Sequence, residues 1–152
     1  MVALGVLRVP EHWQQRSVRY QGQDAELRAW PNAVWAERVE VGMTRRLAQA
    51  LRQQAGAAGW WTGDDAQATR RLLVDVTQLD VDPQAGQLRA VVTWRLLDRR
   101  GQTLGWGSLA DSRSVQVQGA VDEAQALGQW LDGLAAQLAP RVMAALATPP
   151  AH

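Results

Sequence analysis

The sequence predicts a single α/β domain in which a mixed, mostly antiparallel sheet of about five to six strands is packed by two long amphipathic helices. Its 152 residues, 47% of them hydrophobic, have the size and composition of one globular domain. Two stretches, 32–54 and 122–146, repeat apolar residues at helical spacing, whereas 71–118 alternates as strands do. The order of these elements leaves open whether they form two layers or three.

Short strands are predicted in the first part of the chain. Residues 2–9 form an apolar strand that ends at Pro10. Residues 17–20 and 25–29 are weaker strand candidates on either side of a polar turn at 21–24. A helix after 25–29 would allow this strand to run parallel to segment 71–81 through a right-handed crossover.

A first helix is predicted over residues 32–54. Pro31 stands just before it, at a position where a missing N–H costs nothing. Gly56 and Gly59 are typical of a helix end. Apolar residues that recur every four positions are expected to face the sheet: Trp35, Val39, Met43, Leu47 and Leu51. A loop is then expected over 60–65.

Three strands joined by tight turns are predicted between residues 71 and 118. The alternation of the first strand changes phase near Thr77-Gln78, which indicates a β-bulge. Gly105 and Gly107 flank Trp106 in the last strand and indicate a bend or a close approach of the backbone. The inward-facing residues of the first two strands are expected to be Val74, Val76, Val92, Trp94 and Leu96.

The last helix is expected to begin near Asp122-Glu123, because acidic residues suit a helix N-terminus. Its predicted apolar stripe includes Leu127, Trp130, Leu131, Leu134 and Leu138. Pro140 should kink this helix or start a new turn. The domain is therefore assigned to residues 1–147, and residues 148–152 are expected to be a frayed tail.

Composition excludes several kinds of chemistry. There is no cysteine, which excludes disulfides, thiolate zinc sites and thiol catalysis, and His12 and His152 are too few for a multi-histidine metal site. The basic residues are all arginine, are interleaved with 15 acids and leave a net charge of +1, so nucleic acid is not an expected partner. No metal or cofactor is expected.

The chain shows neither an export signal nor an apolar stretch long enough for a transmembrane helix. Two interpretations remain open at this point. The protein is either cytoplasmic, or its sequence is given without the export signal.

Several motifs in a fixed order resemble one family. They are Val9 to Trp13, Trp35-Ala36-Glu37, Arg46-Leu47-Ala48, Arg71 to Val76, Leu79 to Asp82, and Trp94 to Asp98 followed by Gly101. This set resembles the PqiC-like, ABC-type transport auxiliary lipoproteins, which are partners of bacterial MCE-type lipid transport systems. The similarity runs from about Leu4 to Ala145. It implies a three-layer α/β fold similar to that of the N-terminal domain of TolB.

The chain departs from this family at three points. Arg38 stands where the family has a proline, His12-Trp13 replaces the commoner Tyr-Leu, and the export signal and lipidated cysteine are missing. The resemblance implies a non-enzymatic periplasmic lipoprotein domain, anchored by lipid on the periplasmic side of the outer membrane. It also implies docking to an MCE-domain transporter subunit, and it leaves self-association into a homo-oligomer open.

Two other functions compete with this interpretation. A domain that itself binds a lipid would need a sizeable apolar cavity between sheet and helices. An enzyme would need a pocket in which Glu37, Asp75 or Asp111 converges with His12.

Four residues are candidate contacts with a partner: Trp60, Trp61, His12 and Trp13. Trp60 and Trp61 are adjacent in the expected loop, where two indoles cannot easily both point inward. An exposed tryptophan is typical of an interaction hot spot. The alternative is structural: Trp60 would cap the first helix, and Trp61 would cover the edge of the sheet.

Overall fold

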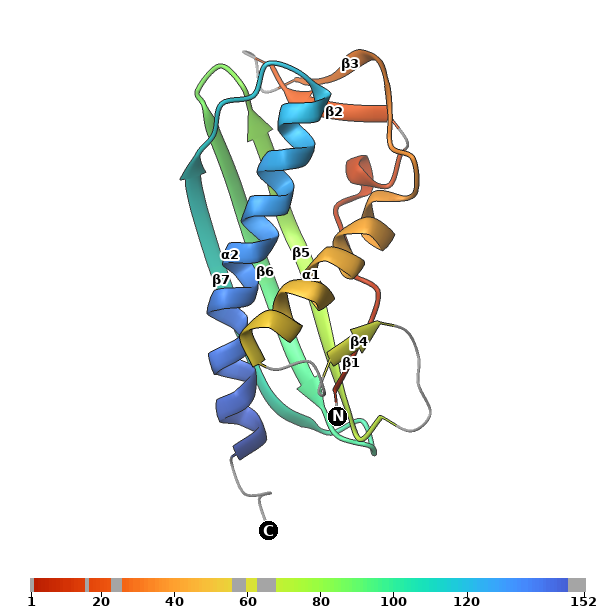
Figure 1. Cartoon of the computed structure of the whole chain (residues 1–152), viewed down its shortest axis with the longest axis vertical. Coiled ribbons are helices and arrows are strands. Elements are labelled where there is room, and N and C mark those ends of the chain that lie inside the picture. The colour runs from red at the N-terminus through yellow and green to blue at the C-terminus, as the bar shows by residue number, and fades with distance from the viewer. Residues whose placement is uncertain (1, 16, 23–25, 56–59, 63–67, 148–152) are drawn as a thin grey trace.

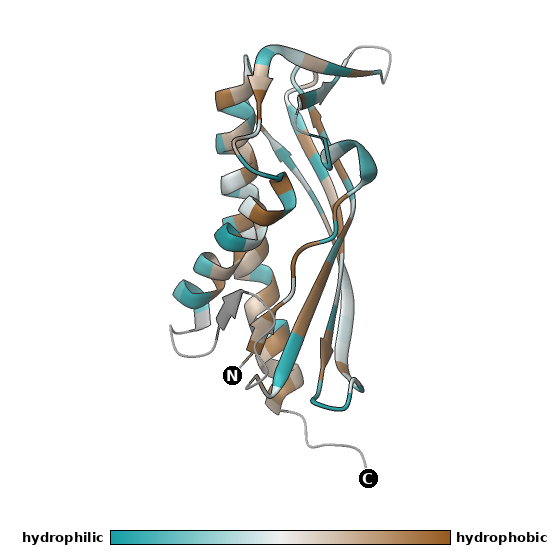
Figure 2. Cartoon of the chain, turned by 90° about the vertical axis from the view of Figure 1, so that its right-hand side faces the viewer, coloured by the Kyte–Doolittle hydropathy of each residue, from teal (hydrophilic) through white to brown (hydrophobic). Residues whose placement is uncertain are grey.

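Two helices cover one face of a mixed sheet in a computed structural model of the chain (Figures 1 and 2). The structure describes residues 2–15, 17–22, 26–55, 60–62 and 68–147. Within them the sheet has the strand order β4 (Trp60–Thr62), β1 (Val2–Leu4), β5 (Arg70–Asp82), β6 (Gln87–Leu97) and β7 (Thr103–Ser114). The arrangement has two layers, because both helices lie on the same face of the sheet, and not the three layers that the resemblance implies (Figures 1 and 2).

Outside the sheet, the described elements are one hairpin, a short 3-10 turn and the two helices. They are β2 (Ser17–Gln21) with β3 (Leu27–Val34), η1 (Glu11–Trp13), α1 (Val39–Ala55) and α2 (Ala120–Ala147). The hairpin lies at the end of the molecule where α2 begins, and the N-terminus lies near the opposite end (Figure 1). The predicted α/β class with two long helices on a mixed sheet is confirmed.

The first helix begins at Val39 rather than at residue 32. Pro31 and Asn32 lie inside β3, and Asn32 has a φ of 56°, a left-handed conformation that asparagine tolerates and a helix does not continue. The carbonyl of Arg38 accepts the first helical hydrogen bonds, from the N–H of Val41 at 3.0 Å and of Gly42 at 3.2 Å. Pro31 therefore marks a strand here, not a helix start.

The parallel partner of β5 is the N-terminal strand β1, not segment 25–29. β1 also pairs in parallel with β4, which occupies part of the expected 60–65 loop. The chain continues beside β5 after β1 ends, because Gly5 N–H donates to the Leu72 carbonyl at 3.0 Å. The described part of segment 25–29 instead belongs to the hairpin, in which β3 begins at Leu27; residues 23–25 lie outside the described part.

The bulge predicted in β5 is confirmed. The pairing of β5 with β6 shifts between Val76 and Gln78, and the Thr77 hydroxyl donates to the Val91 carbonyl at 3.1 Å. Because of this shift, the apolar residues on both sides of it face the helices. Those residues are Leu72, Val74, Val76, Leu79 and Val81, all of them buried.

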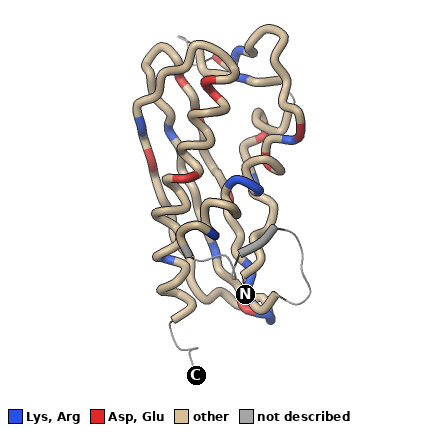
Figure 3. The backbone as a smooth tube through the Cα atoms, viewed as in Figure 1, with Lys and Arg blue, Asp and Glu red and all other residues tan. Residues whose placement is uncertain are grey.

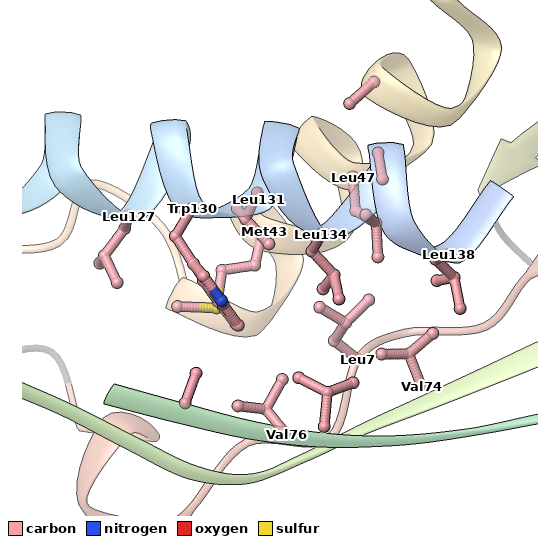
Figure 4. Packing of buried hydrophobic residues seen from close by; sticks show 14 of the residues in the cluster. Leu7, Met43, Leu47, Val74, Val76, Leu127, Trp130, Leu131, Leu134 and Leu138 are labelled. Carbon is pink, nitrogen blue, oxygen red and sulfur yellow. The ribbon is translucent and has the colours of Figure 1, made fainter. Parts of the chain in front are cut away.

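The core lies between this face of the sheet and the two helices (Figure 4). Every predicted core residue is buried except Trp35, which lies before α1 and is half-buried against the cluster. The hydroxyl of Thr44 in α1 accepts the N–H of Leu7 at 2.9 Å. This buried bond attaches the first helix to the N-terminal segment.

Gly105 and Gly107 lie on the inner face of β7, where the Trp94 indole packs against the strand. A Cβ on Gly107 would stand 2.8 Å from Trp94 Nε1, and one on Gly105 would stand 2.7 Å from the Cβ of Ala145. The predicted close approach is therefore confirmed, and its causes are the Trp94 ring at Gly107 and the packing of α2 at Gly105.

The last helix runs from Ala120 to Ala147, with Pro140 inside it. Arginines from two other elements pass over α2 where it carries glycine: Arg46 of α1 over Gly128 and Arg113 of β7 over Gly133. The expected tail, 148–152, lies outside the described residues.

Candidate docking surface

The face of the sheet opposite the helices carries a row of side chains that crosses β5, β6 and the edge strand β7. Leu73, Arg95 and Trp106 are register neighbours across β5, β6 and β7, and they alternate with residues buried on the helix side. The next row holds Asp75, Thr93 and Ser108. The segment after β1 adds Val6 and Arg8, and Arg8 forms a parallel bridge with Asp75. We call these eight residues the Trp106 face.

Trp106 is 76% exposed and Val6 is 57% exposed, which is unusual for such apolar side chains. The two residues line a shallow hollow of about 620 Å³ together with other members of the Trp106 face. The local sequence explains the exposure of Trp106. Its two glycine neighbours face the interior, Gly107 against Trp94 and Gly105 against Ala145 of α2, and alternation along β7 then sends Trp106 outward.

The arginines of this face differ from several others in the molecule. Arg38 binds Glu40 at 2.6 Å, and Arg46 binds both carboxylate oxygens of Asp132, at 3.0 and 2.7 Å. In the part of the chain that the structure describes, neither Arg95 nor Arg8 has an ion-pair or side-chain hydrogen-bond partner. Elsewhere, acidic and basic residues are interspersed along the backbone (Figure 3).

Of the predicted contact residues, Trp13 lies in the core. Its side chain is 3% exposed, and its Nε1 donates to the Leu79 carbonyl at 2.8 Å. The His12 ring is half-buried beside it, with the ring centroids 5.8 Å apart. Trp13 thus acts as a packing residue near the hairpin end of β5.

Trp60 and Trp61 lie in β4, at the edge of the sheet, where they pair with Val2 and Ala3. Their side chains are outside what the structure describes. Because β1 runs beside Arg70–Leu72, whereas Trp13 binds Leu79 further along β5, the structure does not bring these tryptophans together with Trp13.

The carboxylates considered for an enzyme site lie in separate surroundings. Glu37 pairs with Arg45, Asp111 pairs with Arg113 at 3.2 Å, and Asp75 lies on the Trp106 face. Among the described residues, no group of three or more His, Cys, Asp or Glu side chains could hold a metal ion.

A buried carboxyl lies where the hairpin meets α2. Glu123 is fully buried, and Trp30 Nε1 donates to its Oε1 at 3.4 Å, while Trp30 stacks on Tyr20. Its Oε2 has no hydrogen-bond partner in the described part of the protein. Burial raises the pKa of Glu123 to about 8, against a smaller opposing effect of the Trp30 hydrogen bond. A neutral carboxyl therefore supports the hairpin at this position.

The comparisons with known proteins agree with the resemblance seen in the sequence. The model of the ABC-type transport auxiliary lipoprotein component family matches residues 1–139. The chain belongs to this family, whose members are auxiliary lipoproteins of ABC transport and are therefore attached to a membrane of the cell envelope. No curated protein matches the chain in sequence.

Solved structures show the same fold. A crystal structure of an uncharacterized protein has 20% identity and a TM-score of 0.77, over 93% of this chain and 90% of that one. A DUF330-family protein from Xanthomonas campestris has 15% identity and a TM-score of 0.73, over 91% and 81%. The PelC dodecamer from Paraburkholderia phytofirmans has 17% identity and a TM-score of 0.53, over 91% and 83%. No helix among the described residues is both long and apolar enough to cross a bilayer.

Proposed function

We propose that this domain is a non-enzymatic accessory component of an MCE-type lipid transport system, and that it docks to the MCE-domain subunit through the Trp106 face. The observation that carries this proposal is the 76% exposed indole on edge strand β7, on the sheet face that the helices leave uncovered. Tryptophan and arginine are the residues most enriched at binding hot spots, and Trp106 and Arg95 are direct register neighbours.

The location that follows from this proposal is the periplasmic side of the outer membrane. A lipid anchor would hold the domain there while the docking face meets the transporter. An anchor of this kind raises the effective concentration of the domain at the assembly, so a contact of modest area is sufficient.

The proposed test compares Trp106→Ala with the unchanged protein in binding to the purified periplasmic region of the MCE-domain subunit. Loss of a hot-spot indole costs about 2 kcal/mol or more, so the dissociation constant should rise about 30-fold. Val121→Ala is a matched control, because Val121 is also strongly exposed but lies on α2. Equal binding by both variants and the unchanged protein would reject this face as the docking surface.

Self-association is a further proposal, supported by the PelC protein, which forms a dodecamer. The predicted contacts Trp60 and Trp61 belong here, because edge strand β4 is a place where a second chain could add. We expect Trp60→Ala with Trp61→Ala to lower the mass of the oligomer in light scattering. An unchanged oligomer with lowered stability would support the structural role of these indoles instead.

Lipid binding is the second candidate function. The observation in its favour is a shallow, mainly apolar groove of about 310 Å³ between α1 and α2, lined by Trp35, Met43, Leu127 and Leu131 among others. Mass spectrometry of the protein purified from membranes would show a bound lipid if this groove holds one. Gly128→Leu, which narrows the groove, should then abolish that lipid.

A further inference from the structure

We propose that the partner segment that covers the Trp106 face is an acidic stretch of protein, whose carboxylates neutralise Arg95 and Arg8 while an apolar side chain covers Trp106. This inference rests on the proposed docking function and specifies the chemistry of the partner.

Arg95 lies in the middle of the row that a partner would cover. It lies in register between Leu73 on β5 and Trp106 on β7. A partner that removes these two apolar side chains from water therefore also removes the guanidinium between them from water. A guanidinium without a charged partner is costly to bury. Among the described residues no acceptor is bound to Arg95, and the nearby Asp75 also lies next to Arg8, so a partner that covers both arginines has to supply at least one further acceptor. A carboxylate fits, since it can accept two parallel N–H bonds from arginine.

The neighbouring row determines the net charge of the Trp106 face. It contributes Arg8 and Asp75, which are bridge partners through the backbone but form no ion pair with each other. The face therefore carries two arginines against one aspartate, and an acidic partner is complementary to it. Thr93 and Ser108 add hydroxyl groups that can donate to further carboxylate oxygens.

Asp75 also favours a protein over an anionic membrane surface as the occupant. It is half-buried within the hollow, between Arg8 and Thr93, where a continuous layer of lipid phosphates would be brought against it. A folded partner can place its carboxylates beside the two arginines and leave Asp75 uncovered or hydrogen-bonded. Charge complementarity of this detailed kind is how protein interfaces reach specificity.

The test measures binding of the periplasmic region of the MCE-domain subunit to four variants: Arg95→Gln, Arg95→Lys, Arg8→Gln and, as a control, Arg141→Gln. Arg141 is an exposed arginine of α2, on the helix side of the domain. Removing one member of a desolvated charge pair should weaken binding by at least about 30-fold for Arg95→Gln. Arg95→Lys should recover part of this loss, and the control should bind as the unchanged protein does. The dependence of affinity on salt should decrease in Arg95→Gln and Arg8→Gln.

The outcomes separate this inference from the proposed function. If Trp106→Ala weakens binding but Arg95→Gln and Arg8→Gln do not, docking through this face stands and the acidic partner is rejected. If the unchanged protein does not bind the subunit, both are rejected. Co-sedimentation with vesicles of POPC and POPG at about 3:1, compared with POPC alone, tests the membrane. Binding to the anionic vesicles that is lost in Arg95→Gln would overturn the protein partner in favour of lipid.

Discussion

The buried carboxyl of Glu123 gives the protein a definite dependence on pH. Its pKa is raised from 4.5 to about 8, so the native state holds a proton that the unfolded chain has lost between these values. The native state thus binds more protons than the unfolded state, and the free energy of unfolding should fall as pH rises from about 5 to 8.

We expect Glu123→Gln to remove most of this decline, because the amide keeps the size of the side chain and cannot ionise. Urea unfolding at several pH values between about 5 and 9 measures the effect. Glu26→Gln is the control, because this carboxylate is exposed and its nearest partner, Arg28, is 3.8 Å away. If the midpoints of Glu123→Gln and the unchanged protein fall in parallel, Glu123 is ionised in the native state.

Truncation of two tryptophans on neighbouring strands should lower the free energy of unfolding by very different amounts. Trp94 is 6% exposed beneath the helices, so Trp94→Ala should lower the free energy of unfolding by about 3–5 kcal/mol. Trp106→Ala removes an exposed indole and should cost less than about 1 kcal/mol. Urea unfolding measures both variants. A large loss in Trp106→Ala would mean that this indole packs on its own domain.

At the level of the elements, glycines in β7 and α2 should differ in what a methyl group does. Gly107→Ala places a Cβ against the rigid Trp94 ring and should cost about 1–3 kcal/mol by overpacking. In the Trp94→Ala background this cost should disappear, because the obstructing ring is gone. A double-mutant cycle in urea gives the coupling, and additive losses would show that the ring is not the cause.

Gly128 of α2 should show the reverse. A Cβ there would meet the Arg46 guanidinium carbon at 3.5 Å, an ordinary contact. Since glycine inside a helix costs roughly 0.5–1 kcal/mol relative to alanine, Gly128→Ala should raise the thermal unfolding temperature. A lowered temperature would indicate that the Arg46–Asp132 ion pair is displaced.

The elements differed in how well the sequence predicted them. β5, β6 and α2 follow from regular alternation or helical spacing, and the bulge at Thr77 follows from a change of phase. The start of α1 was not predicted correctly, because Pro31 suits either a helix start or an extended segment. The spacing of apolar residues also does not show that Asn32 adopts a left-handed backbone conformation. The parallel place of β1 depends on contacts between distant segments, which periodicity does not contain.

The Trp106 face was only partly predictable from the sequence. The glycines around Trp106 indicated a close approach, but which side of β7 the indole occupies depends on the groups that the glycines face, Trp94 of the paired strand and Ala145 of α2. The sequence predicted a contact at Trp60 and Trp61 instead, because these two indoles are adjacent in an expected loop. The burial of Trp13 could not be predicted from the sequence, because its hydrogen bond to the Leu79 carbonyl joins positions far apart in the chain.

Over the whole molecule, one face of the sheet is covered by helices and the other is exposed. One face is covered by α1 and α2, which together carry most of the buried apolar residues outside the strands. The other carries Trp106 and two arginines without partners among the described residues. This asymmetry is the reason why the proposed docking uses the face that the helices leave uncovered.

The place of β1 between β4 and β5 also affects how fast the sheet can form. Val2 pairs with Trp60 and with Arg70, partners separated from it by 58 and 68 positions, so the chain must close long loops before this strand is held. Long-range parallel pairing of this kind slows folding relative to the local hairpins of β5, β6 and β7. The antiparallel part should therefore form first, and insertion of the N-terminal strand between β4 and β5 should be the slow, final step. Until that step is complete, the two strand edges that β1 joins stay open to pairing with other chains.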